Sequence, residues 1–502
     1  MREPLSPISS EFFHKYLLYG NSLNIAMTVQ IGNDLDRDLV SQALHFVMLK
    51  HPILRSRVAI DLDSPFRYFW EPLQEQQSIP LFYEELRCHS ESLQQELSAL
   101  ETLHHNQTIP CDRTYPFQLF ITSYDRSFTH LQFMMPHAAG DGKSLAICVR
   151  DLLDFYSQLE AGKTPVFEPL QYFPGDWEEL FGYSVDSKKK ESAERLLNAD
   201  LEFQNLPNRD RYGDERDWPN FAGDLQHKQS PQKQALTLIP FPRPLISESQ
   251  HITDGFSSLI KTLHYTFPQE QVSKLKALRK NPLYQTDSGL PYSINDLVSA
   301  LYVQLQLKLA RIAGEEVQFV VLGMAFDLRS FFSKTVWKSA VQDIYLPMVI
   351  ELKIEKEMSE NLCALLKVIN LQKDNALKKM PRLSLEPILL RSQLGNSLTQ
   401  DDWSLFLKFR SEMMQKKISR ILRLSYMGNI NSFFKNLQNF NFLKADFKTT
   451  IAGFPVPSLL LYSFNRELSL TYPYVPEFFN ESEVEMVWQM MIEAIEELCN
   501  AN

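Results

Sequence analysis

The chain has 502 residues, of which 44% are hydrophobic, 12% aromatic and 22% charged. This length favours two or more domains, and the composition is that of a globular protein that buries sizeable cores. The formal net charge of -10 excludes a global basic footprint for nucleic acid. No window reaches the roughly 18–20 uncharged apolar residues of a transmembrane helix.

The start of the chain, MREPLSPISSEFFHKY, lacks the apolar core and small-residue cleavage site of a secretory signal. The five cysteines are scattered, and they form neither C-x-x-C pairs nor a disulfide framework. No cluster of His, Cys, Asp or Glu has the spacing of a metal site. We therefore expect a cytoplasmic protein without a metal and without a nucleic-acid partner.

The first third of the chain alternates strand and helix signals. Strands are predicted at 23–32, 53–60, 65–72, 116–125 and 129–135. Helices are predicted at 36–51, 91–104 and 144–159. The last two strands form a hairpin, and the second of them leads directly into the helix at 144–159. Cys148 lies on the apolar face of that helix, so we interpret it as a core thiol.

Between about residues 162 and 255 the periodicity gives way to proline-rich and charged stretches, which are typical of a connector. A helix is predicted inside it, near 187–201. We place the connector at 176–255, between an N-terminal domain at 1–175 and a C-terminal domain at 256–502. In the second half, strands are predicted at 258–267, 316–329, 421–428, 458–465 and 467–474. Helices are predicted at 268–280, 293–314, 359–374, 401–416 and 482–500. The long helix at 293–314 has Ser293 as its N-cap and Gly314 at its end.

The segment THLQFMMPHAAGDGKS, between the strand and the helix, can be read in two ways. As a phosphate-binding loop of the type G-x-x-x-x-G-K-S, it would carry His137 where the first glycine belongs, and an anionic Asp141 where phosphate should bind. As H-x-x-x-D-G, it places a histidine, the residue type that most often serves as a general base, where it can accept a proton. The second interpretation accounts for more of the residues.

In this interpretation His137 takes a proton from an acceptor hydroxyl or amine, which then attacks a thioester carbonyl. Asp141 has an architectural role, because it pairs with a cation and fixes the loop. Gly142 allows a tight turn and a close approach by substrate or by a neighbouring strand. Lys143 is either a solvated lysine at a helix start or a contact for a donor phosphate.

The chain resembles the chloramphenicol-acetyltransferase-like superfamily, which includes condensation domains, alcohol acetyltransferases and polyketide-associated acyltransferases. The resemblance rests on PHAAGDGKS and on the N-terminal passage from PLSPISSEFFHKY to HPILRSRV, although Pro136 stands where many members carry a second histidine. GMAFDLRS resembles the strand whose arginine pairs with the motif aspartate, which gives that role to Arg329. SYMGNI resembles a segment that places Ser425 and Gly428 near the active-site tunnel, with Ser425 as a candidate oxyanion donor.

The resemblance implies an α/β protein, a two-layer α+β sandwich, in which two similar domains form a pseudo-dimer with a tunnel between them. An acyl thioester enters this tunnel as co-substrate, with acyl-CoA favoured over a phosphopantetheine-linked donor on a carrier protein, and no cofactor is bound permanently. The second half has no H-x-x-x-D, so we expect one active site per chain. We also expect a monomer. The D-F-G-W-G signature of the plant-type branch is missing.

Two other functions remain open, namely a carrier-dependent condensation enzyme and a catalytically inactive binding module of the same fold. Other histidines receive no catalytic role. We expect His104 and His105 at the exposed end of a helix, and the near-match HITDG at 251–255 in a connector loop.

Overall fold

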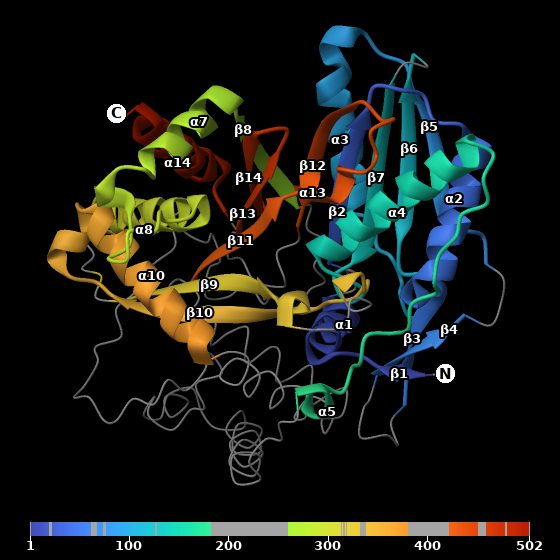
Figure 1. Ribbon diagram of the computed structural model, residues 1–502, viewed down its shortest axis with the longest axis horizontal. Helices are drawn as coiled ribbons and strands as arrows, with labels where there is room; N and C mark the ends of the chain where they lie inside the picture. Colours follow the sequence, from blue (N-terminus) through green and yellow to red (C-terminus); the bar gives the residue numbers. More distant parts are fainter. Residues whose placement is uncertain are drawn as a thin grey trace.

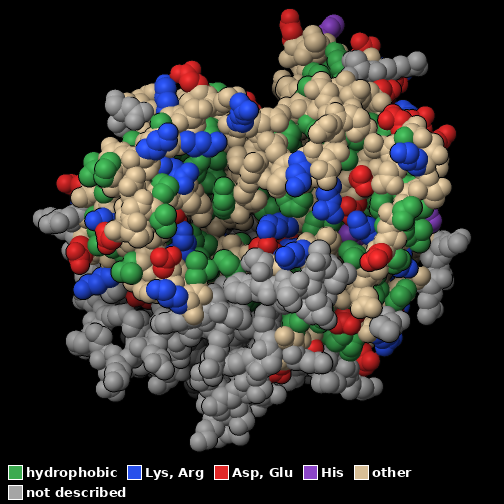
Figure 2. All heavy atoms as spheres, in the orientation of Figure 1, with side chains coloured by type: hydrophobic (Ala, Val, Ile, Leu, Met, Phe, Trp, Pro, Cys, Tyr) green, Lys and Arg blue, Asp and Glu red, His purple; other side chains and the backbone are tan. Residues whose placement is uncertain are grey.

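The structure of the protein is a computed structural model. It describes residues 2–19, 23–61, 68–73, 77–125, 128–181, 260–312, 314, 317, 319–331, 338–379, 421–449, 458–476 and 479–500. They form two lobes that lie side by side, the first built mainly from the first part of the chain and the second from later segments (Figure 1). The space-filling view of the same face shows a notch between the lobes (Figure 2).

The N-terminal lobe contains a five-stranded sheet in the order β12-β2-β7-β6-β5. Its strands are β2 (Asn24–Ile31), β5 (Leu81–Leu86), β6 (Gln118–Tyr124), β7 (Phe128–Pro136) and β12 (Phe442–Lys448). Neighbouring strands are antiparallel except β5 and β6, which are parallel. β2 and β7 are buried along their whole length, since helices cover both faces of the sheet.

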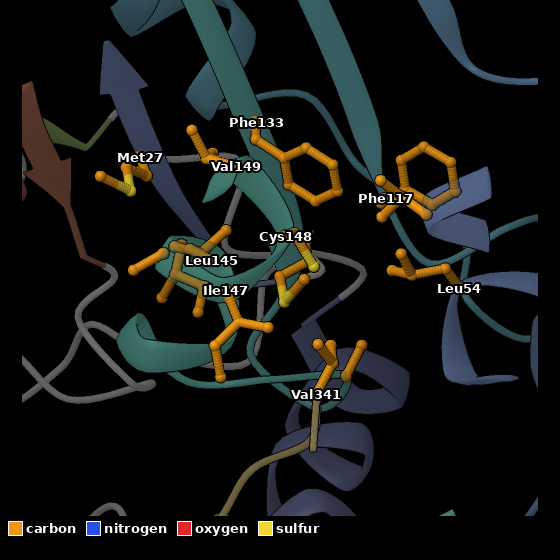
Figure 3. Close-up of a cluster of buried hydrophobic side chains, with 14 of the residues drawn as sticks. Met27, Leu54, Phe117, Phe133, Leu145, Ile147, Cys148, Val149 and Val341 are labelled. Atoms are coloured by element: carbon orange, nitrogen blue, oxygen red, sulfur yellow. The ribbon is translucent and has the colours of Figure 1, made fainter. Parts of the chain in front are cut away.

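Helices α2 (Arg37–Lys50) and α4 (Gly142–Glu160) pack on one face of this sheet, and α3 (Leu93–His105) packs on the other. The apolar face of α4 that the sequence predicted is buried, and it includes Leu145, Cys148, Val149, Leu152 and Tyr156. Figure 3 shows Leu145, Cys148 and Val149 of α4 beside Phe133 of β7. This packing fixes the segment between β7 and α4, because both ends are anchored in the core.

A second, three-stranded sheet in the order β1-β4-β3 flanks the lobe. Its strands are β1 (Glu3–Pro4), β3 (Ser56–Ile60) and β4 (Tyr68–Pro72), and the 3-10 turn η1 (Pro52–Arg55) precedes β3. Helix α1 (Pro7–Tyr19) buries Phe12 and Phe13 between the lobe and segments of the second half. The short helix α5 (Trp177–Phe181) ends the described part of the first half, and Trp177 is fully buried.

The C-terminal lobe contains a six-stranded sheet in the order β10-β9-β11-β13-β14-β8. Its strands are β8 (Lys261–Phe267), β9 (Phe319–Asp327), β10 (Tyr345–Lys353), β11 (Ile421–Asn429), β13 (Ser458–Phe464) and β14 (Glu467–Tyr474). Its helices are α7 (Gln269–Leu278), α8 (Ile294–Ile312), α10 (Leu362–Lys379) and α14 (Glu481–Asn500), with the short turns η4 (Pro282–Tyr284) and η6 (Lys356–Ser359). They pack with the sheet in a separate hydrophobic core. No helix in the described part of the chain is long and apolar enough to cross a bilayer.

Two segments of the second half cross into the N-terminal lobe. Strand β12 pairs with β2 at the edge of the five-stranded sheet, and the short helix α13 (Asn431–Phe434) contributes Phe434 to the same core. The stretch between β9 and β10 also enters this core, and Figure 3 shows its Val341 close to α1 and α4. The polar residues that flank Val341 are therefore carried to the start of α4.

Several expectations from the sequence agree with the observed elements. The predicted strands at 116–125 and 129–135 form the β6–β7 hairpin. Ser293 caps α8, since its Oγ accepts a hydrogen bond from the backbone N–H of Asp296 at 3.1 Å. Gly314 follows α8 with a φ of 77°, in the left-handed region that favours glycine at helix ends.

Other expectations need correction or lie outside the described residues. Residues 53–55 belong to η1, and Arg329 lies in the 3-10 turn η5 (Leu328–Phe331) immediately after β9 rather than in the strand. The local sequence pattern does not predict α1, β5, β10 and β12. The helices expected near 187–201 and 401–416, the HITDG loop and most of the connector lie outside the described residues.

Candidate active site

His137 follows the last residue of β7, at the point where the chain turns toward α4. Its backbone N–H donates to the carbonyl of Leu23 at 3.1 Å, which ties the turn to the start of β2. Its side chain is 14% exposed, so the ring lies mostly inside the protein but reaches solvent. The phenyl ring of Phe12 from α1 stacks on the imidazole, with the ring centroids 3.9 Å apart and the planes at 4°. This stacking fixes the plane of the imidazole.

The Nδ1 atom of His137 lies 3.2 Å from Oδ2 of Asp343. The Asp343 side chain is fully buried in the stretch between β9 and β10, and Oδ1 has no hydrogen-bond partner among the described residues. Burial raises the pKa of Asp343 to about 7, although the neighbouring His137 partly opposes this shift. A carboxyl group of this kind can change its charge state at neutral pH.

Asp141 begins α4 and is held by an arginine from the second half of the chain. Its Oδ1 accepts the backbone N–H of Ser144 at 2.8 Å, as an N-cap does. The Arg329 guanidinium donates Nη1–H to Oδ2 at 2.7 Å and Nη2–H to Oδ1 at 3.0 Å, which is a bidentate pair. Both side chains are buried, so the pair joins the two halves of the chain inside a low-dielectric core.

The charges of this pair are stabilised by their mutual contact. Burial acts to raise the pKa of Asp141, but the charge and hydrogen bonds of Arg329 and the backbone N–H groups of Ser144 and Ile344 outweigh it, so the pKa is lowered. Burial acts to lower the pKa of Arg329, but the charges and hydrogen bonds of Asp141 and Asp327 raise it. Asp141 and Arg329 therefore remain ionised at neutral pH.

The Asp141–Arg329 pair also holds the backbone on both sides of Asp343. Arg329 Nη2–H donates to the carbonyl of Gln342 at 3.0 Å, and Ser144 Oγ accepts the Gln342 N–H at 3.1 Å. On the other side, the backbone N–H of Ile344 donates to Asp141 Oδ2 at 3.1 Å. The motif aspartate thus fixes the segment that presents Asp343 to His137.

Comparisons with known proteins agree with this architecture. Residues 3–179 match the family model of the condensation domain, and none of the curated proteins compared matches the chain. The chain has the condensation-domain fold. This fold is a pseudo-dimer of two chloramphenicol-acetyltransferase-like halves, which confirms the resemblance and the α/β fold class expected from the sequence.

Three solved structures illustrate the condensation-domain fold over nearly the whole chain. The epimerization domain from the third module of tyrocidine synthetase B is 15% identical with a TM-score of 0.60, covering 100% of this chain and 99% of that one. A trichothecene 15-O-acetyltransferase from Fusarium sporotrichioides is 13% identical with a TM-score of 0.61, covering 99% and 94%. The starter condensation domain of rhizomide synthetase, in complex with C8-CoA, is 13% identical with a TM-score of 0.61, covering 100% and 95%.

Within this condensation-domain fold, Gly142 meets a residue of the second lobe. A Cβ at Gly142 would lie 2.6 Å from Sδ of Met427, which is too close for a real contact. Met427 sits at an irregularity of β11 between Tyr426 and Gly428, where Gly428 has a φ of 76°. Gly142 itself does not have a positive φ, so no unusual turn requires the glycine; a larger residue here would instead require the Met427 side chain to shift.

The other expected site residues lie on β11 or beside the Asp141–Arg329 pair. Ser425 is half-buried on β11, opposite Leu460 of β13, and its hydroxyl makes no hydrogen bond to any described residue. The side chain of Lys143 is 36% exposed, and its Nζ donates to Oδ2 of Asp327 at 2.6 Å. The other oxygen of Asp327 accepts from Arg329 at 2.9 Å, so Lys143 extends the buried ion-pair network to the surface.

The sequence does not single out Asp343 or Phe12 as site residues, and the structure corrects the expected exposure of one histidine pair. No motif singles out Asp343, whose only signal is a polar residue within the short apolar stretch SAVQDIYLPMVI. His104 and His105 are buried and not exposed, contrary to the expectation. His104 lies 2.8 Å from Gln132 and 3.0 Å from Glu84, on the face of the five-stranded sheet away from α4.

Proposed function

We propose that this protein is an acyltransferase that moves an acyl group from a thioester to a hydroxyl or amine acceptor, with His137 as the general base. The observation that carries this proposal is the hydrogen bonding of the two ring nitrogens of His137. Nδ1 contacts the carboxyl group of Asp343, whereas Nε2 makes no hydrogen bond to any described residue. An imidazole held at one nitrogen offers the other as a proton acceptor.

The proposed reaction needs no covalent acyl-enzyme. His137 Nε2 takes the proton of the acceptor O–H or N–H while the acceptor's lone pair bonds to the thioester carbonyl carbon. The C–S bond of the resulting tetrahedral intermediate then breaks, and the sulfur leaves as a thiol with the proton held on Nε2. The oxyanion requires a positioned donor, and the loss of such a donor commonly costs about 3–4 kcal/mol in rate. Ser425 is our candidate for this role, with Gly428 beside it.

We favour acyl-CoA as the donor and regard a carrier-bound thioester as the alternative. Support for acyl-CoA comes from the fold shared with a starter condensation domain in complex with C8-CoA. The sequence contains no D-S-L phosphopantetheine attachment motif. The alternative is supported by the similarity to the first condensation domain of the CDA synthetase, at 14% identity and a TM-score of 0.59. Both donors present the same thioester to His137.

We further propose that a tunnel between domains 1–175 and 256–502 brings donor and acceptor together at His137, with residues 176–255 as their connector. The positions of His137 on the first half, and of Asp343 and Arg329 on the second, support a site at the boundary of the two halves. With one H-x-x-x-D-G per chain, we propose that a monomer in the cytoplasm is the active form.

The test measures thiol release from a panel of acyl-CoA thioesters of increasing chain length, with mixed alcohol and amine acceptors. Acyl-pantetheine thioesters in the same panel represent the carrier-bound donor. We compare wild type with His137→Ala and with His264→Ala as a matched control, because His264 also lies beside a buried aspartate, Asp446, at 3.1 Å. Melting temperatures show whether each variant folds.

We expect acceptor-dependent thiol release that falls about 10²–10⁴-fold in His137→Ala and persists in His264→Ala, since a general base contributes an effect of this size. Equal release from wild type and His137→Ala would reject His137 as the base. No release by folded wild type from any thioester would contradict the acyltransferase and favour a binding module of the same fold.

A further inference from the structure

Asp343 is a buried carboxyl group that the proposed reaction does not yet use. It lies 3.2 Å from Nδ1 of His137, it has no exposed side-chain surface, and it comes from the other half of the chain. From this geometry we infer that Asp343 is a positioning residue, which holds His137 in the tautomer with the proton on Nδ1 and so leaves Nε2 free to accept the substrate's proton. This inference rests on the proposed function of His137.

The tautomer follows from what the carboxylate can do. An ionised carboxyl group only accepts hydrogen bonds, so a contact at this distance requires the proton on Nδ1. A neutral imidazole carries one ring proton, and Nε2 is then an acceptor. Phe12 stacks on the ring and prevents it from tilting away from this arrangement.

Asp343 also affects the charge that forms on His137 during the reaction. When Nε2 takes the substrate's proton, the imidazole becomes a cation, and a carboxylate beside Nδ1 stabilises that cation without taking a proton itself. Asp343 can ionise at neutral pH because its pKa lies at about 7. It therefore supplies a negative charge in the pH range where the enzyme is expected to work.

Asp141, the motif aspartate, cannot perform this task. Both of its oxygens are occupied, one by Arg329 and Ser144 and the other by Arg329 and Ile344. Asp343, in contrast, has one oxygen on His137 and the other without a partner among the described residues. The two carboxylates thus divide the work: Asp141 fixes the backbone, and Asp343 contacts the ring.

Besides His137, charged and titratable groups of several other described elements surround Asp343. Asp141 at the start of α4 acts to raise its pKa further, whereas Arg329 of η5 acts to lower it. The pKa of the Tyr345 phenol on β10 is strongly raised. Burial is the largest cause, and the charges of Asp343 and of Glu11 on α1 raise this pKa further. Tyr345 therefore stays neutral, and among the described residues no cation other than a protonated His137 is bonded to Asp343.

The experiment uses Asp343→Asn, which keeps the size of the side chain but can turn its amide N–H toward Nδ1. That contact moves the ring proton to Nε2 and removes the base. Asp446→Asn is the matched control, because Asp446 is also buried beside a histidine, His264, and its contacts lie outside the site. Thiol release gives kcat and KM. Nitrogen NMR on protein labelled in its 11 histidines gives the tautomer, with the His137 signals assigned by their loss in His137→Gln.

We expect kcat to fall about 10²–10⁴-fold in Asp343→Asn with KM little changed, as happens when an orienting carboxylate is lost behind a histidine base. The spectrum of wild type at pH 8 should show His137 with the proton on Nδ1, and Asp343→Asn should move it toward Nε2. Asp446→Asn should leave both readouts unchanged.

The inference is overturned if wild-type His137 carries its proton on Nε2, which can be read even if Asp343→Asn does not fold. It is also overturned if folded Asp343→Asn keeps the wild-type kcat. Failure of the proposed function looks different, because no thioester would then be turned over by wild type. In that case the tautomer of wild type alone decides whether Asp343 orients the ring.

Discussion

Two of the aspartate–histidine pairs in the described part of the chain, His51–Asp151 and His137–Asp343, differ in what surrounds them. His51 lies 2.7 Å from Asp151, and its side chain is only 1% exposed. Asp151 is also bonded by Lys50 at 2.8 Å and by Arg150 at 2.6 Å. The His137–Asp343 pair has a longer contact of 3.2 Å, a histidine that is 14% exposed, and no lysine or arginine bonded to the carboxyl group among the described residues.

The electrostatic consequences are opposite. Burial acts to raise the pKa of Asp151, but the hydrogen bond of His51 and the charges of Arg150 and Lys50 reverse this, so its pKa is lowered. Burial dominates at Asp343, whose pKa rises to about 7. The same two residue types therefore make a permanently charged structural contact in one place and a titratable, accessible pair in the other. Counter-charges and solvent access, not residue identity, make the difference.

The largest expected effect comes from removing Arg329, the cation that holds the backbone beside the His137–Asp343 pair. Arg329→Ala leaves the Asp141 carboxylate buried without its counter-charge, so we expect the free energy of unfolding to fall by about 5 kcal/mol, the upper end for a broken buried ion pair. Urea denaturation measures the loss. Thiol release by the folded fraction should also drop, because the backbone beside Asp343 loses its hydrogen bonds to Arg329. Normal unfolding together with normal activity would contradict the role of the Asp141–Arg329 pair in holding the site.

A smaller loss of stability is expected at the first pair. Asp151→Asn removes the charge shared by Lys50 and Arg150, and we expect a loss of about 3 kcal/mol, the lower end of the same range, because both cations are partly exposed and can reach solvent. Thiol release per folded molecule should stay near wild type. A fall in kcat at unchanged stability would mean that the His51–Asp151 pair also serves the reaction. The contrast between a structural pair and a catalytic pair would then be wrong.

The dependence of stability on pH should separate the two aspartates with opposite signs. The raised pKa of Asp343 means that the folded chain binds its proton more tightly than the unfolded chain. Its contribution is therefore present below about pH 4 and is lost as the pH rises to about 7, by up to about 1.4 kcal/mol per pH unit. For Asp151 the pKa is lowered, so its contribution is present above about pH 4 and is lost as the pH falls.

Urea denaturation of wild type, Asp343→Asn and Asp151→Asn between about pH 2 and pH 8 measures this difference. From pH 4 to pH 7, the unfolding free energy of Asp343→Asn should rise relative to wild type, whereas the deficit of Asp151→Asn should shrink only below about pH 4. Parallel curves for wild type and Asp343→Asn would show that Asp343 is ionised throughout, as Asp151 is.

Much of the local structure could be predicted from the chain itself. The hairpin before His137, the amphipathic helix after it and the Ser293 cap are encoded by contacts within a few residues, so periodicity and turn chemistry reveal them. Strands β10 and β12 are not predicted, because local contacts do not determine every strand. Both lie in the second half, and β12 becomes a strand through pairing with β2, some 400 residues away in sequence. Local pattern carries little information about such a partner.

The residues of the candidate site also differ in whether the sequence or only the folded structure identifies them. The sequence by itself determined the residues at the start of α4, because His137, Asp141 and Gly142 form a short motif at fixed spacing between a strand and a helix. The resemblance then pointed to Arg329 as the partner of Asp141, a contact that only the folded chain makes. Asp343 has no motif, and it reaches His137 only because Arg329, Ser144 and Asp141 hold the backbone beside it. The tertiary structure decided the pKa of this carboxyl group, since burial depends on packing between the two halves of the chain and not on spacing along it.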